Sequence, residues 1–522
     1  MNRGLKLQKT AHFSVLFLLT TMPVLFGAVH PVVIGAYTSF ILIIIGGWLL
    51  LNSRVLPGNS LFSRRTIVLF VLITWIICSI IPLPLSLLES ISPIRAAYLQ
   101  HVNQLAEMQI VRAPLAYNSS AAIMTAIFLF ALFLYGTALK VLLAADRSLL
   151  QRILYACIGI GLLEAVYGML QAINPELGVL WLTDITQFKG MARGTIIYKN
   201  QYASLLNMCW PLAVGAALLH FRIRPSQSRS HRKKSQHTSK RKRSRSEEEY
   251  IASRRLRGTV FLFLASFIMM AVVFSQSRGG IISMAIILLL LLVALPVSKK
   301  NKLRLTGVLL LFVVLYGSFI DFSSVVERFM RIQESGQGRF RIWLSSLTML
   351  SDHLAVGIGV GAYESLSSVY LKQFPEQIIF DRAHNDYLEF AIEFGLPAAL
   401  FFFCSFFIIL AGYARHLCSY STKKLPQLRS ATIIALVAFA GIIGFLFHGT
   451  ADFGWRLPVN LLYFTTLLVL LVHGTRPQPQ QSHHYRHTSR LRPAVTRKRD
   501  DQQLNSADLH KRHKRHPSSS GR

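Results

Sequence analysis

The chain has 522 residues, of which 52% are hydrophobic and 15% are charged, and its mean hydropathy is +0.44. A soluble protein carries about 25% charged residues, so this composition excludes an ordinary soluble enzyme and predicts a polytopic membrane protein. The formal net charge of +33 is typical of a nucleic-acid-binding protein, but its distribution among the loops argues against that class.

Twelve hydrophobic stretches are long enough to cross a lipid bilayer. They predict an all-α polytopic integral membrane protein with about 12 transmembrane helices and a large external loop between spans 9 and 10. The first stretch follows three basic residues, as in a signal peptide. It is long enough to span and lacks a small-residue cleavage site, so we interpret it as a membrane helix. The approximate limits are 11–29, 32–51, 66–83, 121–143, 150–173, 201–221, 258–275, 279–296, 305–320, 386–412, 430–448 and 457–473.

Lys and Arg gather in alternate loops, and this determines the predicted orientation. With the N-terminus in the cytoplasm, every short internal loop is basic, and the internal segments carry most of the 56 Lys and Arg residues. The external segments hold slightly more acids than bases. We therefore predict cytoplasmic N- and C-termini, and membrane lipids rather than nucleic acid as the partner of the positive charge.

The sequence divides into a transmembrane scaffold at 1–185, a membrane domain at 186–475 and a basic tail at 476–522. The membrane domain contains a basic cytoplasmic insert at 222–257 and an external loop at 321–385. The insert and the tail have few apolar residues, so we predict that both are disordered and attracted to anionic lipid. Nucleic-acid binding by the insert is the alternative. The five cysteines show neither disulfide nor zinc spacing.

Two features stand out in the first part of the chain. Leu and Ile recur at helical spacing within the external interval 84–120, which favours a surface helix or a simple connector. Glu164 lies inside a predicted span. An acid in the membrane is either functional or a buried, hydrogen-bonded structural group.

Cationic residues follow at the outer ends of two predicted spans. Arg193 and Lys199 precede the sixth span, where they suit either an anion or a lipid anchor. Arg278 stands in the tight turn SQSRGG before the eighth span. An arginine this close to the membrane needs an anionic partner, which is either a structural carboxylate or a phosphate.

The external segment 321–393 is the main candidate for chemistry. Arg339 and Arg341 stand two apart on a predicted interfacial helix. His384 stands at the start of the helix that leads into span ten, and an imidazole with a pKa of about 6.5 is the best general base in the chain. On the following helix Asn385, Glu389 and Glu393 are four apart and share one face. A structural capping role for His384 is the alternative.

A further polar cluster follows span eleven. His448, Asp452 and Arg456 are four apart in FHGTADFGWR, a spacing that allows a His–Asp hydrogen bond. The pair either orients this turn or completes the external site. The histidines in the basic tail alternate with Lys and Arg, which opposes metal binding, so no metal and no cofactor are expected.

Five short motifs resemble the O-antigen ligase and polymerase family in their order and predicted external placement. They are MARGTIIYKNQYASLL at 191–206, SQSRGG at 275–280, GQGRFRIW at 336–343, GIGVGAYES at 357–365 and AHNDYLEFAIEFGLPAAL at 383–400. FHGTADF at 447–453 and the twelve-span layout support them. The resemblance covers roughly 190–460, whereas the insert at 222–257 and the basic tail depart from the family pattern.

The resemblance implies a GT-C-like membrane glycosyltransferase in the bacterial inner membrane. Members transfer a glycan from undecaprenyl diphosphate to an acceptor hydroxyl without a metal. By resemblance, Arg278 binds the donor diphosphate with help from Arg193, and His384 positions or deprotonates the acceptor. Arg339 or Arg341 supplies a further cation, while Asn385, Glu389, His448 and Asp452 are candidate substrate-binding residues.

The enzyme interpretations differ in the acceptor that receives the glycan. Ligation of O-antigen or a related polysaccharide to a lipid A–core-type glycolipid is the first. A polysaccharide polymerase and a protein O-oligosaccharyltransferase are alternatives, and the absence of an extra external domain disfavours the second of these. A membrane transporter related to bicarbonate transporters is the alternative from another class. Glu164 is the only acid deep within a predicted span, which favours surface chemistry over transport.

Overall fold

The computed structural model describes residues 2–52, 64–182, 188–222, 239–295, 297–319, 332–375, 380–420 and 424–476. Residues Met1–Arg476 form one compact unit. The basic tail predicted at 476–522 lies outside the described residues except for Arg476. Residues 223–238 of the insert and residues 321–331 and 376–379 of the external loop also lie outside them.

The described residues are mainly helical. The helices are α1 (Asn2–Val24), α2 (Pro31–Phe40), α3 (Gly47–Leu51), α4 (Arg64–Ser79), α5 (Leu85–Ile91), α6 (Pro93–Leu105), α7 (Ser119–Ala145), α8 (Arg147–Ile173), α9 (Lys199–Phe221), α10 (Ser239–Phe274), α11 (Arg278–Ala294), α12 (Lys299–Phe319), α14 (Ile332–Asp352), α15 (Tyr363–Tyr370), α16 (Asp386–Phe394), α17 (Leu396–Cys418), α18 (Ser430–His448) and α19 (Pro458–Thr475). Short helical turns are η1 (Phe26–Ala28), η2 (Ile41–Gly46), η5 (Leu425–Gln427) and η6 (Gly454–Arg456), and strands β1 (Leu83–Pro84) and β2 (Arg112–Ala113) pair antiparallel.

Within the described residues, eight helices are long and apolar enough to cross a membrane. They include α7, α8, α9, α17, α18 and α19, together with the continuous helix Pro31–Leu51 and the apolar part of α10. Two further predicted spans correspond to the shorter apolar helices α4 and α11. The polytopic helical class is confirmed, while the predicted count of twelve includes α1 and α12, which are not among the eight.

Two sequence-based expectations were wrong in detail. The tenth span was predicted to begin at residue 386, but α16 and α17 are separate helices that meet at Gly395, whose φ of +82° breaks the helical path. The insert at 222–257 was predicted to be disordered, yet residues from Ser239 onward belong to α10. Extending an existing membrane helix into Lys, Arg and Glu residues is favourable because the costly nucleation step is already complete.

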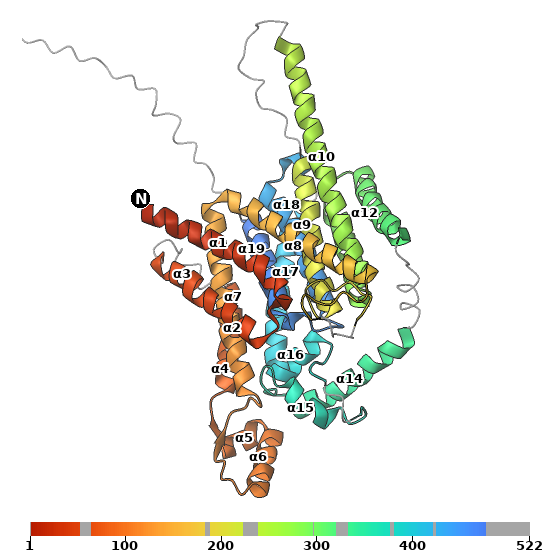
Figure 1. Cartoon of the computed structure of the whole chain (residues 1–522). Helices are drawn as coiled ribbons and strands as arrows, with labels where there is room; N and C mark the ends of the chain where they lie inside the picture. Colours follow the sequence, from red (N-terminus) through yellow and green to blue (C-terminus); the bar gives the residue numbers. More distant parts are fainter. Residues whose placement is uncertain are drawn as a thin grey trace, which may run out of the picture. The chain divides into compact units, whose positions relative to one another are not determined.

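Helix α9 forms the centre of the helical core. Every residue from Gln201 to Leu218 is buried, and α9 packs against α8, α10, α11, α18 and α19 (Figure 1). Its buried polar side chains are satisfied, since Asn207 donates to Gly280 O at 2.8 Å and accepts from Trp210 Nε1 at 3.0 Å. Helix α17 is peripheral by contrast, with Leu400, Phe401 and Ile408 exposed in the way expected of a lipid-facing helix.

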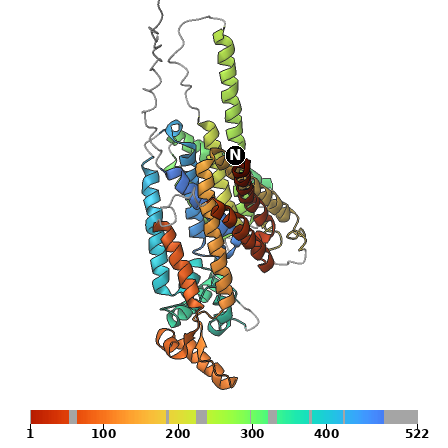
Figure 2. The same cartoon turned by 90° about the vertical axis from the view of Figure 1, so that its left-hand side faces the viewer.

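The external segments gather at one end of this bundle. Helices α14, α15 and α16 lie there together with α5 and α6, whereas the start of α10 lies at the opposite end (Figures 1 and 2). The interval 84–120, predicted as a surface helix or a connector, contains α5 and α6, which are separated by Ser92, and α6 begins at Pro93. Leu88, Ala96, Leu99 and Ala113 give this lobe its own small core.

The glycine-rich loop VGIGVG connects α14 and α15 and packs tightly on α16. Gly357, Gly359 and Gly361 all have positive φ. The amide of Gly359 donates to Glu393 O at 3.0 Å, and the amide of Gly361 donates to the Glu393 carboxylate at 2.8 Å. The glycines therefore allow a close backbone approach that fixes the C-terminal end of α16.

Candidate functional site

His384 is held in a strained loop just before α16. Its φ is +53°, a left-handed conformation that costs a non-glycine residue about 1–3 kcal/mol. The loop is fixed on both sides, because the Ala383 amide donates to Glu389 Oε2 at 3.0 Å and the Asn385 side chain caps α16 by accepting from Tyr387 N and Leu388 N. Asn385, predicted to bind substrate, thus has a capping role in the structure.

The surroundings of His384 favour a neutral imidazole. The ring packs edge-on against Phe453 with centroids 4.9 Å apart, and Nδ1 is buried with no hydrogen-bond partner among the described residues. Burial and then the positive charge of Arg339 lower the pKa of His384 to about 4, against a smaller opposite effect of Glu389. The imidazole is therefore unprotonated at neutral pH and can accept a proton.

Arg339 reaches this cluster and Arg341 does not. The Arg339 guanidinium donates to Ala451 O at 2.7 Å, in the turn that follows α18. Its charge acts on His384 and also on Asp452. The Arg341 side chain is exposed, and its backbone carbonyl accepts a hydrogen bond from Gln373. The two arginines lie on different faces of α14, so only the first faces the histidines.

His448 and Asp452 lie close to each other at the turn that Arg339 contacts. His448 Nε2 lies 3.4 Å from Asp452 Oδ2, and both side chains are buried. His448 Nδ1 forms a 2.7 Å hydrogen bond with Ser204 Oγ, which links α18 to α9. Burial raises the pKa of Asp452 to about 6, while Arg339, the Phe453 amide and Asn200 lower it. This carboxyl group therefore changes charge close to neutral pH.

The turn between α10 and α11 places Arg278 beside His448. Ser277 caps α11 by accepting from Gly280 N, so Arg278 is the first residue of that helix. The neighbouring Gly279 lies directly against the His448 ring. Lys199 Nζ donates to Gln276 O at 3.1 Å, which brings the start of α9 to the same turn. Backbone N–H groups at the start of α11, Arg278 and Lys199 together favour an anion here.

Arg193 lies in a loop that packs against this turn. The Ala192 amide donates to Phe274 O at 2.9 Å, and the Arg193 side chain is fully buried, which lowers its pKa. Glu164 accepts hydrogen bonds from the amide and hydroxyl of Thr195 at 2.8 and 2.6 Å. These bonds support the structural interpretation of Glu164, since its carboxylate holds the Arg193 loop in place.

The acids of α16 form an ion-pair network with Arg456. Its guanidinium lies 2.8 Å from Glu389 Oε1 and also pairs with Glu393, and both carboxylates are buried. Burial lowers the pKa of Arg456, but the two acids outweigh burial and raise it overall. Burial raises the pKa of Glu393 and of Asp386. Glu389, predicted to bind substrate, therefore has Arg456 as its partner in the structure.

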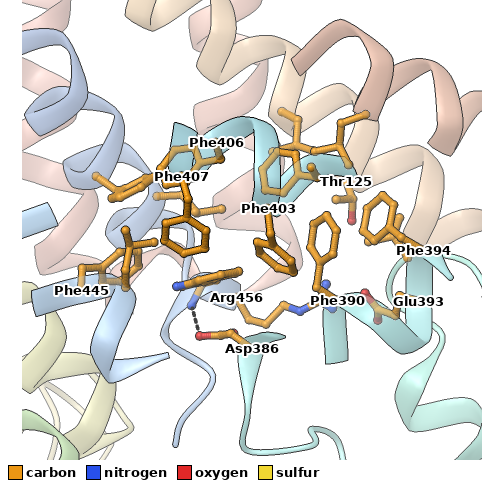
Figure 3. Close-up of a pocket in the computed structure, with 18 residues that line it drawn as sticks. Thr125, Asp386, Phe390, Glu393, Phe394, Phe403, Phe406, Phe407, Phe445 and Arg456 are labelled. Carbon is orange, nitrogen blue, oxygen red and sulfur yellow. Dashed lines mark hydrogen bonds and ion pairs between the residues drawn. The ribbon is translucent and has the colours of Figure 1, made fainter. Parts of the chain in front are cut away.

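An aromatic cavity adjoins this network. Its volume is about 170 Å³, and its lining comes from α4, α7, α16, α17, α18 and α19. The rings of Phe390, Phe403 and Phe407 group around the space, with Asp386 and Arg456 along its edge (Figure 3). An apolar cavity beside charged groups suits an amphiphilic ligand, with its chain against the rings and its polar end toward the charges.

Residues 261–403 match the model of the O-antigen ligase family. The chain carries an O-antigen ligase domain. No curated protein matches the chain. The predicted resemblance to this family is thus confirmed for residues 261–403, a shorter range than the 190–460 expected from the motifs. The matched residues include Arg278, Arg339 and His384, while Arg193, His448 and Asp452 lie outside them.

Several members of the cluster were missed by sequence reasoning. Phe453 links His384 to Tyr198, whose ring centroid lies 5.4 Å away, and Ser204 orients His448. The pairing of Arg456 with Glu389 and Glu393 was also missed. Arg456 lies 63 residues from Glu393 and farther still from Glu389, so the sequence gives no local signal for these pairs.

Proposed function

We propose that this protein transfers a glycan from undecaprenyl diphosphate to an acceptor hydroxyl at the outer leaflet of a bacterial inner membrane. The observation that carries the proposal is the neutral His384 within a cluster that also contains Arg339 and the α11 turn with Arg278. The O-antigen ligase domain supports a glycan-transfer function of this type.

In this proposal Arg278 binds the diphosphate of the donor. Its position as the first residue of α11 adds backbone N–H groups to its guanidinium, and Lys199 on α9 donates to Gln276 O in the preceding turn. The leaving diphosphate carries negative charge, so fixed cations lower the energy of the transition state. Arg193 assists through its loop, which is hydrogen-bonded to the end of α10.

His384 accepts the proton of the acceptor hydroxyl. The oxygen attacks the anomeric carbon, the bond from that carbon to the diphosphate breaks, and undecaprenyl diphosphate leaves with the electron pair. Burial, with a smaller contribution from Arg339, lowers the pKa of His384 and keeps it unprotonated. Arg339, Asp452 and His448 line the place where the acceptor sugar binds.

The aromatic cavity accommodates part of an isoprenoid chain. It is apolar along Phe390, Phe403 and Phe407 and adjoins the Arg456 network, so a lipid-linked substrate has its chain in the cavity and its polar end near the cluster. The first acceptor we propose is a lipid A–core-type glycolipid.

Glycan profiling of a deletion strain tests the function. Loss of polymer on lipid A–core with accumulation of lipid-linked polymer identifies a ligase. Accumulation of single repeat units on the carrier lipid identifies a polymerase, and loss of glycan from protein serines identifies an oligosaccharyltransferase. An unchanged profile in the deletion overturns the transferase proposal and favours the transporter.

A further inference from the structure

A second cavity, of about 290 Å³, lies far from the His384 cluster. It is lined by the C-terminal end of α9 and the first residue of α18, whereas the His384 cluster meets the opposite ends of the same two helices. Lys199 and Arg222 are separated by the length of α9, which at 1.5 Å per residue is roughly 35 Å. The two sites are therefore independent.

Arginines from both edges of the basic insert converge on this cavity. Arg222 follows α9, while Arg254 and Arg257 lie one turn apart on α10. The other lining residues are Gln151, Leu154, Tyr155, Ala216, Leu219, His220, Tyr250 and Ser430. None of these described lining residues is a carboxylate. A concave site with three guanidinium groups and no acid is complementary to an anion.

The structure holds two of these arginines in fixed positions. Arg222 donates from Nη1 to Leu428 O at 2.6 Å and from Nη2 to Ser430 Oγ at 3.0 Å. Arg254 donates to His220 O at 3.1 Å and to Tyr250 Oη at 3.2 Å. These backbone and hydroxyl acceptors fix the orientation of the Arg222 and Arg254 guanidinium groups at the cavity.

Arg257 has a different position. It lines the cavity, its side chain is exposed, and it makes no hydrogen bond or ion pair with another described residue. Both faces of its guanidinium are thus available to a ligand. Glu247, Glu248 and Glu249 are nearby on α10, but their side chains are exposed and do not line the cavity.

The remaining lining suits the junction between headgroup and chain of a lipid. Tyr155 and His220 both stack on Phe261, with ring centroids 5.7 and 5.4 Å apart, and form an apolar wall beside the arginines. The volume equals that of roughly nine or ten water molecules at about 30 Å³ each, enough for a phosphate and its attached glycerol. Basic pockets between transmembrane helices at the cytoplasmic side are a known type of lipid site.

We propose that this cavity binds a phosphate-bearing group, supplied by an anionic phospholipid such as phosphatidylglycerol in the inner leaflet. Arg222, Arg254 and Arg257 would then tie the adjoining ends of α9, α10 and α18 to the lipid surface. This site is separate from the proposed glycan transfer, so either proposal can fail without the other.

Native mass spectrometry of the delipidated full-length protein tests the proposal. Phosphatidylglycerol or phosphatidylcholine is titrated, and the affinity of the tightest-bound lipid is compared between wild type and Arg257→Gln. Loss of one charge-assisted contact weakens phosphatidylglycerol binding about tenfold or more and leaves phosphatidylcholine unchanged. Arg222→Gln is expected to act in the same direction.

Arg255→Gln is the matched control. Arg255 is exposed on the same helix and does not line the cavity, so its substitution removes one positive charge outside the site. Equal weakening by Arg255→Gln and Arg257→Gln overturns the proposal, because surface charge alone would then explain binding. Competition by inorganic phosphate in wild type supports recognition of the phosphate. If inorganic phosphate binds in an Arg257-dependent way and the lipid does not, the phosphate chemistry stands and its source is soluble.

Discussion

Gly279 lies against the imidazole of His448 so closely that a methyl group on its α-carbon would stand 2.8 Å from Cδ2 and 2.9 Å from Nε2. This contact joins the start of α11, which carries Arg278, to the end of α18. The cation proposed for the donor and the polar groups proposed for the acceptor are therefore coupled through one glycine.

Gly279→Ala is expected to push the start of α11, which carries Arg278, away from His448 at the end of α18. The added methyl group forces His448 or α11 to move, which costs about 1–3 kcal/mol and lowers both the melting temperature and glycan transfer. Gly159→Ala is the control, since a Cβ at Gly159 meets nothing within 4 Å. Equal melting temperatures and activities for the two variants would show that the close contact has no functional consequence.

Arg339→Gln and Arg341→Gln form a matched pair. Both remove one charge from α14, but only Arg339 contacts the turn after α18. We expect Arg339→Gln to reduce the transfer rate by about tenfold or more, because it removes a charged group next to the reacting atoms. The transfer rate of Arg341→Gln is expected to stay near that of wild type. Initial rates with a lipid-linked donor measure this. A larger loss of transfer for Arg341→Gln than for Arg339→Gln would contradict the assignment of Arg339 to the site.

The pH dependence of transfer reports on His384. Its pKa is lowered to about 4, so the base is present at neutral pH and is lost as the pH falls through about 4. Removing the charge of Arg339 raises the pKa of His384 toward its ordinary value, so the acidic midpoint of Arg339→Gln shifts to higher pH. Each profile is scaled to its own maximum. An acidic midpoint that does not move would indicate that His384 is not the titrating base.

Arg456→Gln is predicted to destabilise the fold. It leaves Glu389 and Glu393 buried without their shared counter-charge, at a cost of about 3 kcal/mol or more. Arg382→Gln is the control, because Arg382 lies 3.5 Å from Glu389, whereas Arg456 lies 2.8 Å from Glu389 and also forms an ion pair with Glu393. A thermal melt of both variants measures the difference. A melting temperature for Arg456→Gln at or above that of the control would refute the structural role of the network.

Filling the aromatic cavity tests its proposed occupant. Thr125 lines it, so Thr125→Phe reduces the space and is expected to raise KM several-fold for a donor with a full-length isoprenoid. A donor with a short isoprenoid should be affected less. Met124→Phe is the control, since Met124 is 68% exposed and does not line the cavity. Equal KM changes for the two donor lengths would mean that the cavity holds no isoprenoid.

The sequence predicted the helical class well because long apolar stretches determine it. It was less successful where a helix ends. Gly395 separates α16 from α17 and Pro397 lies in the first turn of α17, yet the residues on both sides are apolar enough to be interpreted as one span. The helical start of α10 was also missed, because composition reports the lack of a hydrophobic core and not the continuation of a neighbouring helix.

The sequence allowed the candidate residues of the site to be chosen by their chemistry, but it did not predict which of them contact one another. His384, His448 and Asp452 were identified from their chemistry and local spacing. Arg339 and Arg341 could not be distinguished, because residues two apart on a helix point in different directions and only the packing of α14 selects one. The ion pairs of Arg456 depend on contacts between distant segments, which no local pattern encodes.

The central claim is that His384 is the base for glycan transfer. The most direct measurement is transfer by purified protein from a lipid-linked donor, comparing wild type, His384→Ala and His384→Gln at neutral pH with His101→Ala as an exposed control. We predict that both His384 variants lose at least about a hundredfold in rate with melting temperatures near wild type, while the control keeps full activity. Full transfer by His384→Ala at equal protein amounts would contradict the account.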